Sequence, residues 1–295
     1  MSKQKEIPLL TPDLFREKYY SAEHRLKNPV DYKGFYLQYI FLKTPIKVHR
    51  KPVYEFLFLT KGSTVRYKGI DKYTVRKNQL FFVPAYQVTG SESVSKDIEG
   101  YYFSFTLDFF SPLSMGKELF KKFSFLQFAG YPLININKEG LPQILAIIKR
   151  IEKEYLEKPA NWKDIIGIYL LSLFFELSKF EKKENTVTSN AAARITSQFK
   201  KALALHYKEK QKVTDYASML AVTPNHLNKC IKEATGKSTH ELIQDMILME
   251  SKVLLQQTDL PISDIAFQFG KTPTDFSRLF KSRTGQSPTE YRTID

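Results

Sequence analysis

The sequence predicts a two-domain α+β protein, in which an antiparallel β-barrel followed by helices precedes an all-helical domain. Three observations predict this class. Short apolar runs at strand spacing fill residues 31–110, amphipathic helical patterns follow at 141–180, and one segment of the last third occurs twice. A charged and then Thr-, Ser- and Asn-rich stretch at 181–193 is expected to be the linker. We therefore expect domains at 1–180 and 194–295.

Apolar and aromatic runs at 35–42, 53–59, 64–67, 80–83 and 101–107 predict the strands of the first domain. Glycines, prolines and polar pairs separate these runs, as is typical of an antiparallel barrel or sandwich. Two helices are expected next, at 141–156 and 161–180. They carry more apolar residues than one sheet face requires. Either they pair across a homodimer through 141–180, or both pack on their own barrel.

The last third of the chain contains an internal repeat without gaps. Residues 215–242 match residues 264–291 at nine of 28 positions. This agreement exceeds chance and indicates two copies of one structural unit. The identical pairs are Asp215/Asp264, Ala217/Ala266, Thr223/Thr272, Pro224/Pro273, Lys232/Lys281, Thr235/Thr284, Gly236/Gly285, Ser238/Ser287 and Glu241/Glu290.

Each copy carries the signals that begin and end helices. Thr223 and Thr272 are expected N-caps, and each is followed by a proline at the first helical position. Gly236 and Gly285 suit the left-handed residue that follows a helix. A shorter helix is expected upstream in each copy, at 215–221 and 264–269. The unit is therefore helix, turn, helix.

The second helix of each copy has one apolar and one polar face. The apolar residues recur at i, i+3, i+4 and i+7: Leu227, Cys230, Ile231 and Ala234, then Phe276, Leu279 and Phe280. The other face carries amides, hydroxyls and cations, as a helix needs to read a major groove. The candidate DNA-binding residues are Thr223, Asn225, His226, Asn228, Lys229 and Lys232 in the first copy, and Thr272, Thr274, Ser277, Arg278 and Lys281 in the second.

Individual residues of this set have different expected roles. Arg278 is the strongest candidate to read a base, because a guanidinium can bond bidentately to guanine. Lys232 and Lys281 suit phosphate better than bases. Asp275 is expected to complete the helix cap at Thr272. Cys230 is expected to be a small core residue.

The run 239–257 lacks proline and glycine and predicts a single helix between the two copies. At 1.5 Å per residue this helix would span roughly 28 Å. It could hold the two polar helices about one DNA turn apart, a separation of roughly 34–36 Å. One monomer could then read two adjacent groove segments. A stacked repeat array is disfavoured, because such arrays need three or more copies.

These features resemble the double helix-turn-helix domain of the AraC/XylS family of transcriptional regulators. The resemblance covers about 195–292 and rests on 223–229, Leu254-Leu255, Ile265-Ala266, Gly270, 276–281, Thr284-Gly285, and Ser287-Pro288 leading to Tyr291-Arg292. It implies binding to double-stranded promoter DNA, and to RNA polymerase if the protein is an activator. The chain departs from the family at Lys271, where the turn after Gly270 is one residue shorter, and at Met246, where arginine is usual. The effect of the shorter turn on base preference does not follow from the sequence.

The first domain resembles the cupin-like regulatory domain that often precedes such a DNA-binding domain. The matching features are His49, Glu55 with Gly62 seven residues later, and the run 78–84. Enzymatic cupins hold a metal with clustered histidines and a glutamate. Here only His49 and Glu55 remain, and Thr89 stands where a histidine is common. We therefore expect neither a metal nor a cofactor.

A small barrel can instead enclose one small-molecule effector. The candidate pocket residues are mainly tyrosines, which offer an apolar wall with a polar tip. The alternative is that these residues are ordinary core or surface positions of the barrel. The candidates are Tyr36, Gln38, Tyr54, Glu55, Tyr67, Phe82, Tyr86 and Tyr102.

The net charge of +14 does not by itself indicate DNA binding. Residues 194–295 hold 15 basic and 11 acidic side chains, a net of +4, whereas residues 1–193 hold 30 and 20, a net of +10. The single cysteine excludes an intramolecular disulfide. No signal peptide is evident, and no apolar run is long enough to span a membrane, so a cytoplasmic protein is expected.

The sequence thus favours a sequence-specific DNA-binding transcriptional regulator that responds to a signal through its first domain. Two alternatives stay open. One is an effector-independent regulator whose barrel serves only to dimerise, and the other is a cupin enzyme with an accessory helical domain. The effector, the direction of regulation, the oligomeric state and the target promoters do not follow from the sequence.

Overall fold

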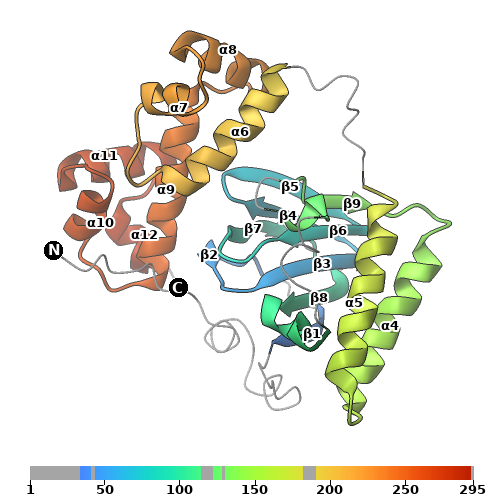
Figure 1. The fold of residues 1–295 in the computed structure, drawn as a ribbon. Helices are drawn as coiled ribbons and strands as arrows, with labels where there is room; N and C mark the ends of the chain where they lie inside the picture. Colours follow the sequence, from blue (N-terminus) through green and yellow to red (C-terminus); the bar gives the residue numbers. More distant parts are fainter. Residues whose placement is uncertain (1–33, 41–43, 114–121, 128–129, 182–190, 294–295) are drawn as a thin grey trace. The chain divides into compact units, whose positions relative to one another are not determined.

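The computed structural model describes residues 34–40, 44–113, 122–127, 130–181 and 191–293. The chain divides into two compact units (Figure 1). One unit contains the β-strands with helices α4 and α5, and the other contains helices α6 to α12. Each unit is described by itself below.

Strands of the first unit form two sheets. The five-stranded sheet has the order β1-β8-β3-β6-β9, and the four-stranded sheet has the order β2-β7-β4-β5. Antiparallel pairing joins six pairs of these strands: β1–β8, β3–β8, β3–β6, β6–β9, β2–β7 and β4–β7. The strands are β1 (Phe35–Ile40), β2 (His49–Arg50), β3 (Tyr54–Lys61), β4 (Ser63–Lys68), β5 (Asp71–Arg76), β6 (Gln79–Val83), β7 (Val88–Val94), β8 (Glu99–Phe105) and β9 (Leu133–Asn135).

Antiparallel sheets followed by helices agree with the sequence-based expectation, but a closed barrel is not shown. No strand ladder joins one sheet to the other within the described residues, so the sheets remain two separate layers. The five-stranded sheet is the central layer. On β3, Phe56 and Phe58 point to the core shared with the helices, whereas Leu57 and Leu59 belong to the core between the sheets. Burial on both faces explains the continuous apolar runs of β3 and β6.

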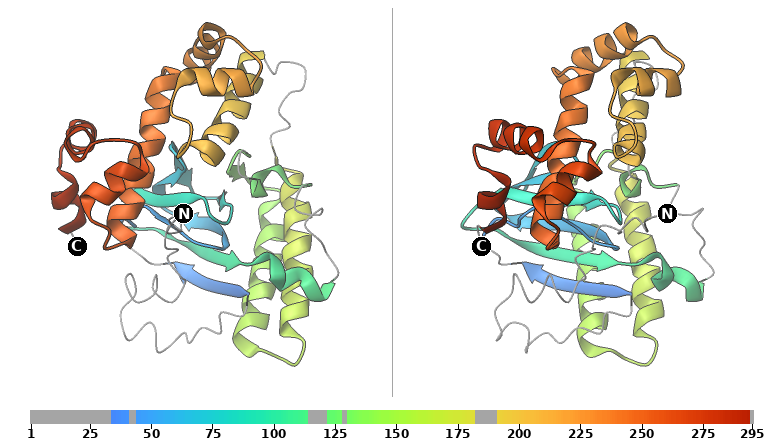
Figure 2. Two further views of the ribbon diagram at one scale, coloured as in Figure 1. Left: turned by 60° about the vertical axis from the view of Figure 1, so that its left-hand side comes forward. Right: turned by 90° about the vertical axis from the view of Figure 1, so that its left-hand side faces the viewer.

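Helices α4 (Leu141–Glu157) and α5 (Trp162–Ser178) lie side by side and cover the outer face of the five-stranded sheet (Figures 1 and 2). Their bounds agree closely with the two predicted helices. They bury Ile144, Ile148, Ile151, Ile166, Leu170, Leu173, Phe174 and Leu177. The helices therefore do pack on their own sheet. Some apolar surface remains, because Ile168 is 54% and Phe175 is 39% exposed.

Two 3₁₀ segments, η1 (Leu107–Leu113) and η2 (Ser124–Leu126), add aromatic side chains to this core. Phe174 of α5 is at its centre and contacts the rings of Phe82, Phe105, Phe110, Phe123 and Phe125. The buried ammonium of Lys68 donates to the carbonyl oxygens of Gln127 and Gly130, next to η2.

The second unit is all-helical within the described residues, as predicted. Its helices are α6 (Ala191–His206), α7 (Val213–Met219), α8 (Pro224–Thr235), α9 (Thr239–Gln257), α10 (Ile262–Gln268), α11 (Pro273–Thr284) and α12 (Pro288–Thr293). One apolar core joins α6, α7 and α8 to α9, and continues through α10, α11 and α12. Helix α9 is 19 residues long and lies between the two copies of the repeat (Figure 2).

The central position of Phe174 gives a first prediction. Phe174→Ala should lower the free energy of unfolding of the first unit by about 3–5 kcal/mol, because it empties the centre of an aromatic cluster. The exposed variant Leu156→Ala on α4 should change it by about 0.5 kcal/mol or less, because this side chain is 66% exposed. Trp162 is the only tryptophan of the chain and belongs to α5, so its fluorescence during urea unfolding reports on this unit. Equal destabilisation by both variants would contradict this account of the core.

Candidate DNA-binding interface and the cavity between the sheets

The two candidate recognition helices, α8 and α11, begin and end in the same way. The hydroxyl of Thr223 accepts a hydrogen bond from the His226 amide at 3.2 Å, and that of Thr272 accepts one from the Asp275 amide at 3.1 Å. Gly236 and Gly285 end the helices with φ values of 74° and 79°, in the left-handed region that favours glycine. The predicted caps are thus present in both copies.

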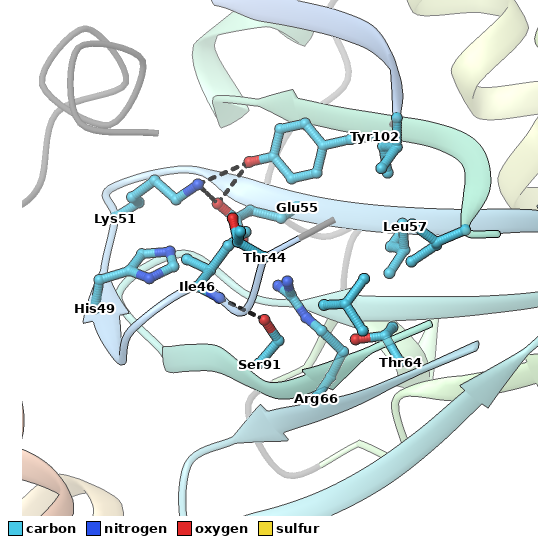
Figure 3. Close-up of a pocket in the computed structure, with 13 residues that line it drawn as sticks. Thr44, Ile46, His49, Lys51, Glu55, Leu57, Thr64, Arg66, Ser91 and Tyr102 are labelled. Carbon is cyan, nitrogen blue, oxygen red and sulfur yellow. Dashed lines mark hydrogen bonds and ion pairs between the residues drawn. The ribbon is translucent and has the colours of Figure 1, made fainter. Parts of the chain in front are cut away.

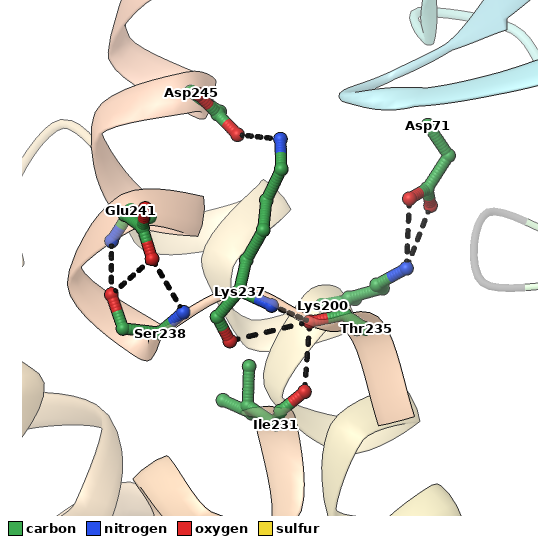
Figure 4. Close-up of polar contacts among 8 residues, drawn as sticks. All are labelled: Asp71, Lys200, Ile231, Thr235, Lys237, Ser238, Glu241 and Asp245. Carbon is green, nitrogen blue, oxygen red and sulfur yellow. Dashed lines mark hydrogen bonds and ion pairs between the residues drawn. The ribbon is translucent and has the colours of Figure 1, made fainter. Parts of the chain in front are cut away.

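The residues after each recognition helix also make the same contacts in both copies, and Figure 4 shows those of the first copy. The Thr235 hydroxyl donates to the Ile231 carbonyl at 2.8 Å, and Thr284 does the same to Phe280. Ser238 and Glu241 form a capping box at the start of α9. Ser287 and Glu290 make the equivalent pair of hydrogen bonds in the second copy. These contacts hold the pKa of both glutamates below the usual range, because backbone N–H groups donate to the carboxylates.

Most residues that are identical between the copies therefore end helices or fill the core. Ala217 and Ala266, for example, are both buried. Lys232 and Lys281 differ, because both are exposed on the polar face of their helices. A cation that both copies keep at the same exposed position suits a contact that does not depend on base sequence, which is a phosphate contact.

The polar face of each recognition helix is otherwise different in the two copies. Asn225, His226 and Lys229 are exposed on α8, whereas Thr274 and Arg278 are exposed on α11. The Arg278 side chain is 77% exposed and its guanidinium lies 3.8 Å from the Asp275 carboxylate, one turn away. The Asp275 carboxylate also accepts a hydrogen bond from the Thr272 hydroxyl at 2.7 Å, which places it at the cap as expected.

Two candidates lie nearer the core than the sequence suggested. Asn228 and Ser277 occupy equivalent positions, and both are half-buried. The amide oxygen of Asn228 accepts a hydrogen bond at 3.0 Å from the backbone N–H of Thr239, the first residue of α9. Asn228 therefore connects α8 to α9, a role that its exposed-face spacing did not reveal. Ala234, which the spacing placed on the apolar face, is exposed.

Cys230 is 4% exposed and belongs to the core, as expected for this position. Its sulfur lies 3.7 Å from Nε2 of His226, one turn earlier on α8. The His226 ring therefore lies along the helix next to the core, and its backbone N–H is used by the Thr223 cap.

A cavity lies between the two sheets of the first unit (Figure 3). The volume of this cavity is about 50 Å³, which is room for a few waters or one small molecule. One part of its wall is apolar and comprises Ile40, Ile46, Leu57, Val94 and Ile98. The rest is polar and comprises Thr44, His49, Lys51, Glu55, Thr64, Arg66, Ser91 and Tyr102.

A buried ion pair forms one side of this cavity. Lys51 and Glu55 are 4% and 3% exposed and contact each other directly. Tyr102 bridges them, because the Lys51 ammonium donates to its oxygen at 2.9 Å and its hydroxyl donates to Glu55 at 2.6 Å. Burial alone would raise the pKa of Glu55, but the attraction of Lys51 outweighs it and holds that pKa below the usual range. Burial lowers the pKa of Lys51, and attraction by Glu55 opposes this shift.

His49 is neutral in this environment. Burial, helped by the nearby Lys51 charge, lowers the pKa of His49 to about 3. Since the neutral ring carries one proton, the 2.8 Å contact between its Nδ1 and the Lys47 carbonyl places that proton on Nδ1. His49 thus adds no charge to the cavity near neutral pH.

Arg66 reaches the cavity because β4 has an inverted pattern of burial. Thr64, Arg66 and Lys68 are buried, whereas the apolar Val65 and Tyr67 between them are only half-buried. Arg66 is 8% exposed, donates to the Thr89 hydroxyl at 3.3 Å, and has its guanidinium 5.9 Å from the centre of the Phe81 ring. Hydrophobic alternation alone would turn this strand the other way, so the sequence pattern did not indicate that Arg66 is buried. Lys51, which lies between β2 and β3, was not a sequence-based candidate either.

The candidate pocket residues predicted from the sequence divide into two groups. Glu55 and Tyr102 line the cavity, and Tyr36 and Gln38 lie beside Tyr102, where they hydrogen-bond to each other. The other four lie elsewhere. Tyr54 stacks on Phe105, Phe82 belongs to the aromatic core under the helices, Tyr67 is half-buried beside Lys72, and Tyr86 is 54% exposed in a turn.

In the part of the chain that the structure describes, no three acidic, histidine or cysteine side chains are grouped as a metal ion requires. Among the same residues, no helix combines the length and the apolar character that crossing a membrane requires.

The second unit contains two helix-turn-helix motifs, each exposing a helix with polar and basic side chains, and this defines a DNA-binding domain. A helix-turn-helix domain family matches residues 216–294. This match assigns residues 216–294 to a helix-turn-helix family, and the relatives of the chain include proteins named as helix-turn-helix transcriptional regulators.

Relatives of the chain include two uncharacterised helix-turn-helix regulators of Bacillus subtilis. YisR is 32% identical over 123 residues, which is 41% of this chain and 43% of YisR, so the match spans less than half of that relative. YfiF is 21% identical over 257 residues, or 84% and 79% of the two chains. Among solved structures, ToxT from Vibrio cholerae with a bound unsaturated fatty acid is 19% identical, with a TM-score of 0.43 over 90% of this chain and 97% of that one.

The contrast between Arg278 and Lys281 gives a second prediction. Arg278→Ala should reduce affinity by about 1–3 kcal/mol at one base position and relax the preference there. Lys281→Ala should weaken binding to all duplexes and reduce the salt slope by about 1, because one phosphate contact is lost. Binding titrations on specific and random duplex over a salt series separate the two effects. Equal losses on both duplexes for Arg278→Ala would contradict its role.

The neutral, buried His49 gives a third prediction. Its pKa is about 3 in the folded protein, against about 6.5 in an unfolded chain. Between these values the unfolded state binds the extra proton, so stability falls as the pH decreases below about 6.5, by about 1.4 kcal/mol per pH unit from this group. His49→Gln should remove that part of the slope. Urea unfolding followed by Trp162 fluorescence at several pH values between neutrality and about pH 5 tests it. An unchanged slope in the variant would show that His49 is not the group responsible.

Proposed function

We propose that this regulator binds promoter DNA by placing α8 and α11 in two successive segments of one face of the major groove. The observation that carries the proposal is the pair of identically capped helices held on one connecting helix. Helix α9 has 19 residues and is roughly 28 Å long. That length is comparable with the roughly 34–36 Å between major-groove segments on one face of DNA.

The two helices would read different bases. Their caps and core positions are alike, but the exposed side chains differ at every candidate position except the N-cap threonines and Lys232/Lys281. We infer an asymmetric operator of two unlike boxes. Arg278 would contact a guanine, Asn225, His226, Lys229 and Thr274 would contact neighbouring base edges, and Lys232 and Lys281 would contact phosphate. Thr223 and Thr272 would present the helix N-termini to the DNA backbone. The half-buried Asn228 and Ser277 would contribute to DNA binding indirectly, by fixing the position of α8 and α11.

The first unit is proposed to be a cupin-like sensor that adjusts DNA binding when a small molecule occupies its cavity. The cavity favours this function over a barrel used only for dimerisation, because a purely structural core has no need for Lys51 and Arg66 inside it. In this proposal the protein acts in the cytoplasm, and contacts RNA polymerase if it is an activator.

A homodimer through α5 is also proposed. Ile168, Leu171 and Phe175 recur at i, i+3 and i+7 on this helix, and Ile168 and Phe175 remain substantially exposed after the helix has packed on its own sheet. Light scattering at tens of micromolar should show a dimer, and Ile168→Glu should convert it to a monomer. A monomeric wild-type protein would reject this interface.

The experiment that tests the DNA-binding proposal is selection of full-length protein on a random duplex library near physiological salt. The expected motif has two dissimilar boxes with centres about one helical turn apart, roughly 10 base pairs. Arg278→Ala serves as the matched variant and should lose information at one position of one box. Recovery of a single box, or of a palindrome, would contradict the two-helix arrangement.

A further inference from the structure

The first turn of α9 contains a hydrogen bond that comes from the recognition helix α8. A helix leaves its first amides without partners in its own backbone. In α9 the Ser238 hydroxyl accepts from the Glu241 amide at 3.2 Å, within the helix's own cap. The Thr239 amide instead donates to the side-chain oxygen of Asn228 at 3.0 Å. One donor of α9 is therefore satisfied by a side chain of α8.

This hydrogen bond is shielded from water. Thr239 is fully buried and Asn228 is half-buried. If the Asn228 amide were lost, the Thr239 N–H would remain in the protein interior without an acceptor, and burying an unpaired donor is costly. The structure avoids that cost when α8 or α9 moves far enough for water to reach the N–H. The bond therefore fixes how α8 is oriented on α9.

A second buried hydrogen bond holds the same helix from α6. The Thr196 hydroxyl of α6 donates to the Cys230 carbonyl at 3.3 Å, and both residues are at most 5% exposed. Cys230 lies two positions after Asn228 in α8. Lys229, between them in the chain, is exposed. Hydrogen bonds to two other helices thus meet next to a candidate base-reading side chain.

The second copy lacks the counterpart of the Asn228 bond for a chemical reason. Thr239 corresponds to Pro288, which is also buried. Proline has no N–H, so this position needs no acceptor. Asn228 corresponds to Ser277, and among the described residues the side-chain hydrogen bonds of α11 stay within 272–286. The N–H donor and its amide acceptor are therefore present together in one copy and absent together in the other.

We propose that Asn228 is a positioning residue for DNA recognition, which fixes the rotation of α8 through the Thr239 amide and does not itself contact a base. The side chains of α8 are attached to one rigid helix, so a rotation moves all of its exposed side chains together. Asn225, His226 and Lys229 would then lose their register with the bases at once, whereas α11 would keep its own. The inference rests on the proposed DNA-binding function, and it names a residue that sets the specificity of one of the two boxes.

The test repeats the selection on a random duplex library with full-length Asn228→Ser, at a temperature at which every variant is folded. The selected motif should keep the box read by α11 and lose information at all positions of the box read by α8. Arg278→Ala, which affects the α11 box, identifies which box is which. Affinity for the wild-type motif should fall by about tenfold, the effect of losing one buried hydrogen bond. Affinity for random duplex should change little, because flexible lysine side chains can follow the DNA backbone.

A second substitution separates positioning from direct contact. Asn228→Ser combined with Thr239→Pro gives the first copy the pair that the second copy has, and removes the N–H together with its acceptor. Proline fits the first position of a helix, and Ser238 before it is extended with φ −71° and ψ 159°, as a residue before proline prefers to be. The double variant should recover the α8 box and most of the lost affinity. A direct base contact by Asn228 could not be restored in this way.

Asn225→Ala is the matched control on the same helix. Asn225 is exposed, so its loss should change the preference at one position of the α8 box and leave the other positions intact. Adding Thr239→Pro should not restore that position. Thermal unfolding of each variant records its stability separately from its DNA binding.

Three results would overturn the proposal. If Asn228→Ser changes a single position and the double variant does not restore it, Asn228 reads a base. If affinity falls equally for both boxes and for random duplex, Asn228 only stabilises the fold. If the selected motif is unchanged, the bond does not set the orientation of α8.

The design also covers a variant that does not fold. If Asn228→Ser is unfolded, the double variant decides alone, because an α8 box that lacks one position would identify a base contact and a complete box would support positioning. The three contrary results all presuppose the wild-type motif. A wild-type protein that selects no two-box motif would instead reject the proposed function itself, and this inference with it.

Discussion

The hydrogen bonds at the helix ends are the interactions on which the DNA-binding unit depends. A helix of 12 residues, such as α8 or α11, is marginal by itself and leaves unpaired N–H and C=O groups at both ends. The threonine hydroxyl at each start and the left-handed glycine at each end satisfy some of these groups. They also fix the residue at which the helix begins, and this decides which side chains face outward. A shift of one residue would rotate the polar face of α11 by about 100° and turn Arg278 away from it.

This dependence explains the distribution of identity and difference between the two copies. The residues that repeat are those that set the ends and the core of the helices, together with the exposed pair Lys232 and Lys281. The exposed positions between them have diverged. One scaffold can therefore present two different surfaces to the DNA, and the shared lysines would position both surfaces on the backbone without regard to sequence.

The first unit illustrates a different constraint. Its central sheet is buried on both faces, which supplies apolar packing against α4 and α5 on one side and against the second sheet on the other. That packing can compensate for a region between the sheets that is poorly suited to a core. The inverted strand β4, with Arg66 and Lys68 inside, reduces apolar burial locally. The buried Lys68 donates to the carbonyl oxygens of Gln127 and Gly130, and the buried Arg66 lines the cavity between the sheets.

The sequence by itself determined the helical unit almost completely. Thr-Pro starts, glycine ends and 3.6-residue periodicity are local signals, and the repeat provided each of them twice, so the helices and most of the exposed recognition residues could be read from it. The tertiary structure alone decided the details that depend on distant neighbours. It placed Asn228 against the start of α9, and it brought Lys51, Glu55 and Arg66 from separate strands to one cavity. It also showed two sheets where a closed barrel was expected. Strand pairing and the direction in which a strand faces are set by contacts between residues far apart in the chain, and a charged residue such as Arg66 turns inward only because the surrounding fold compensates for its burial.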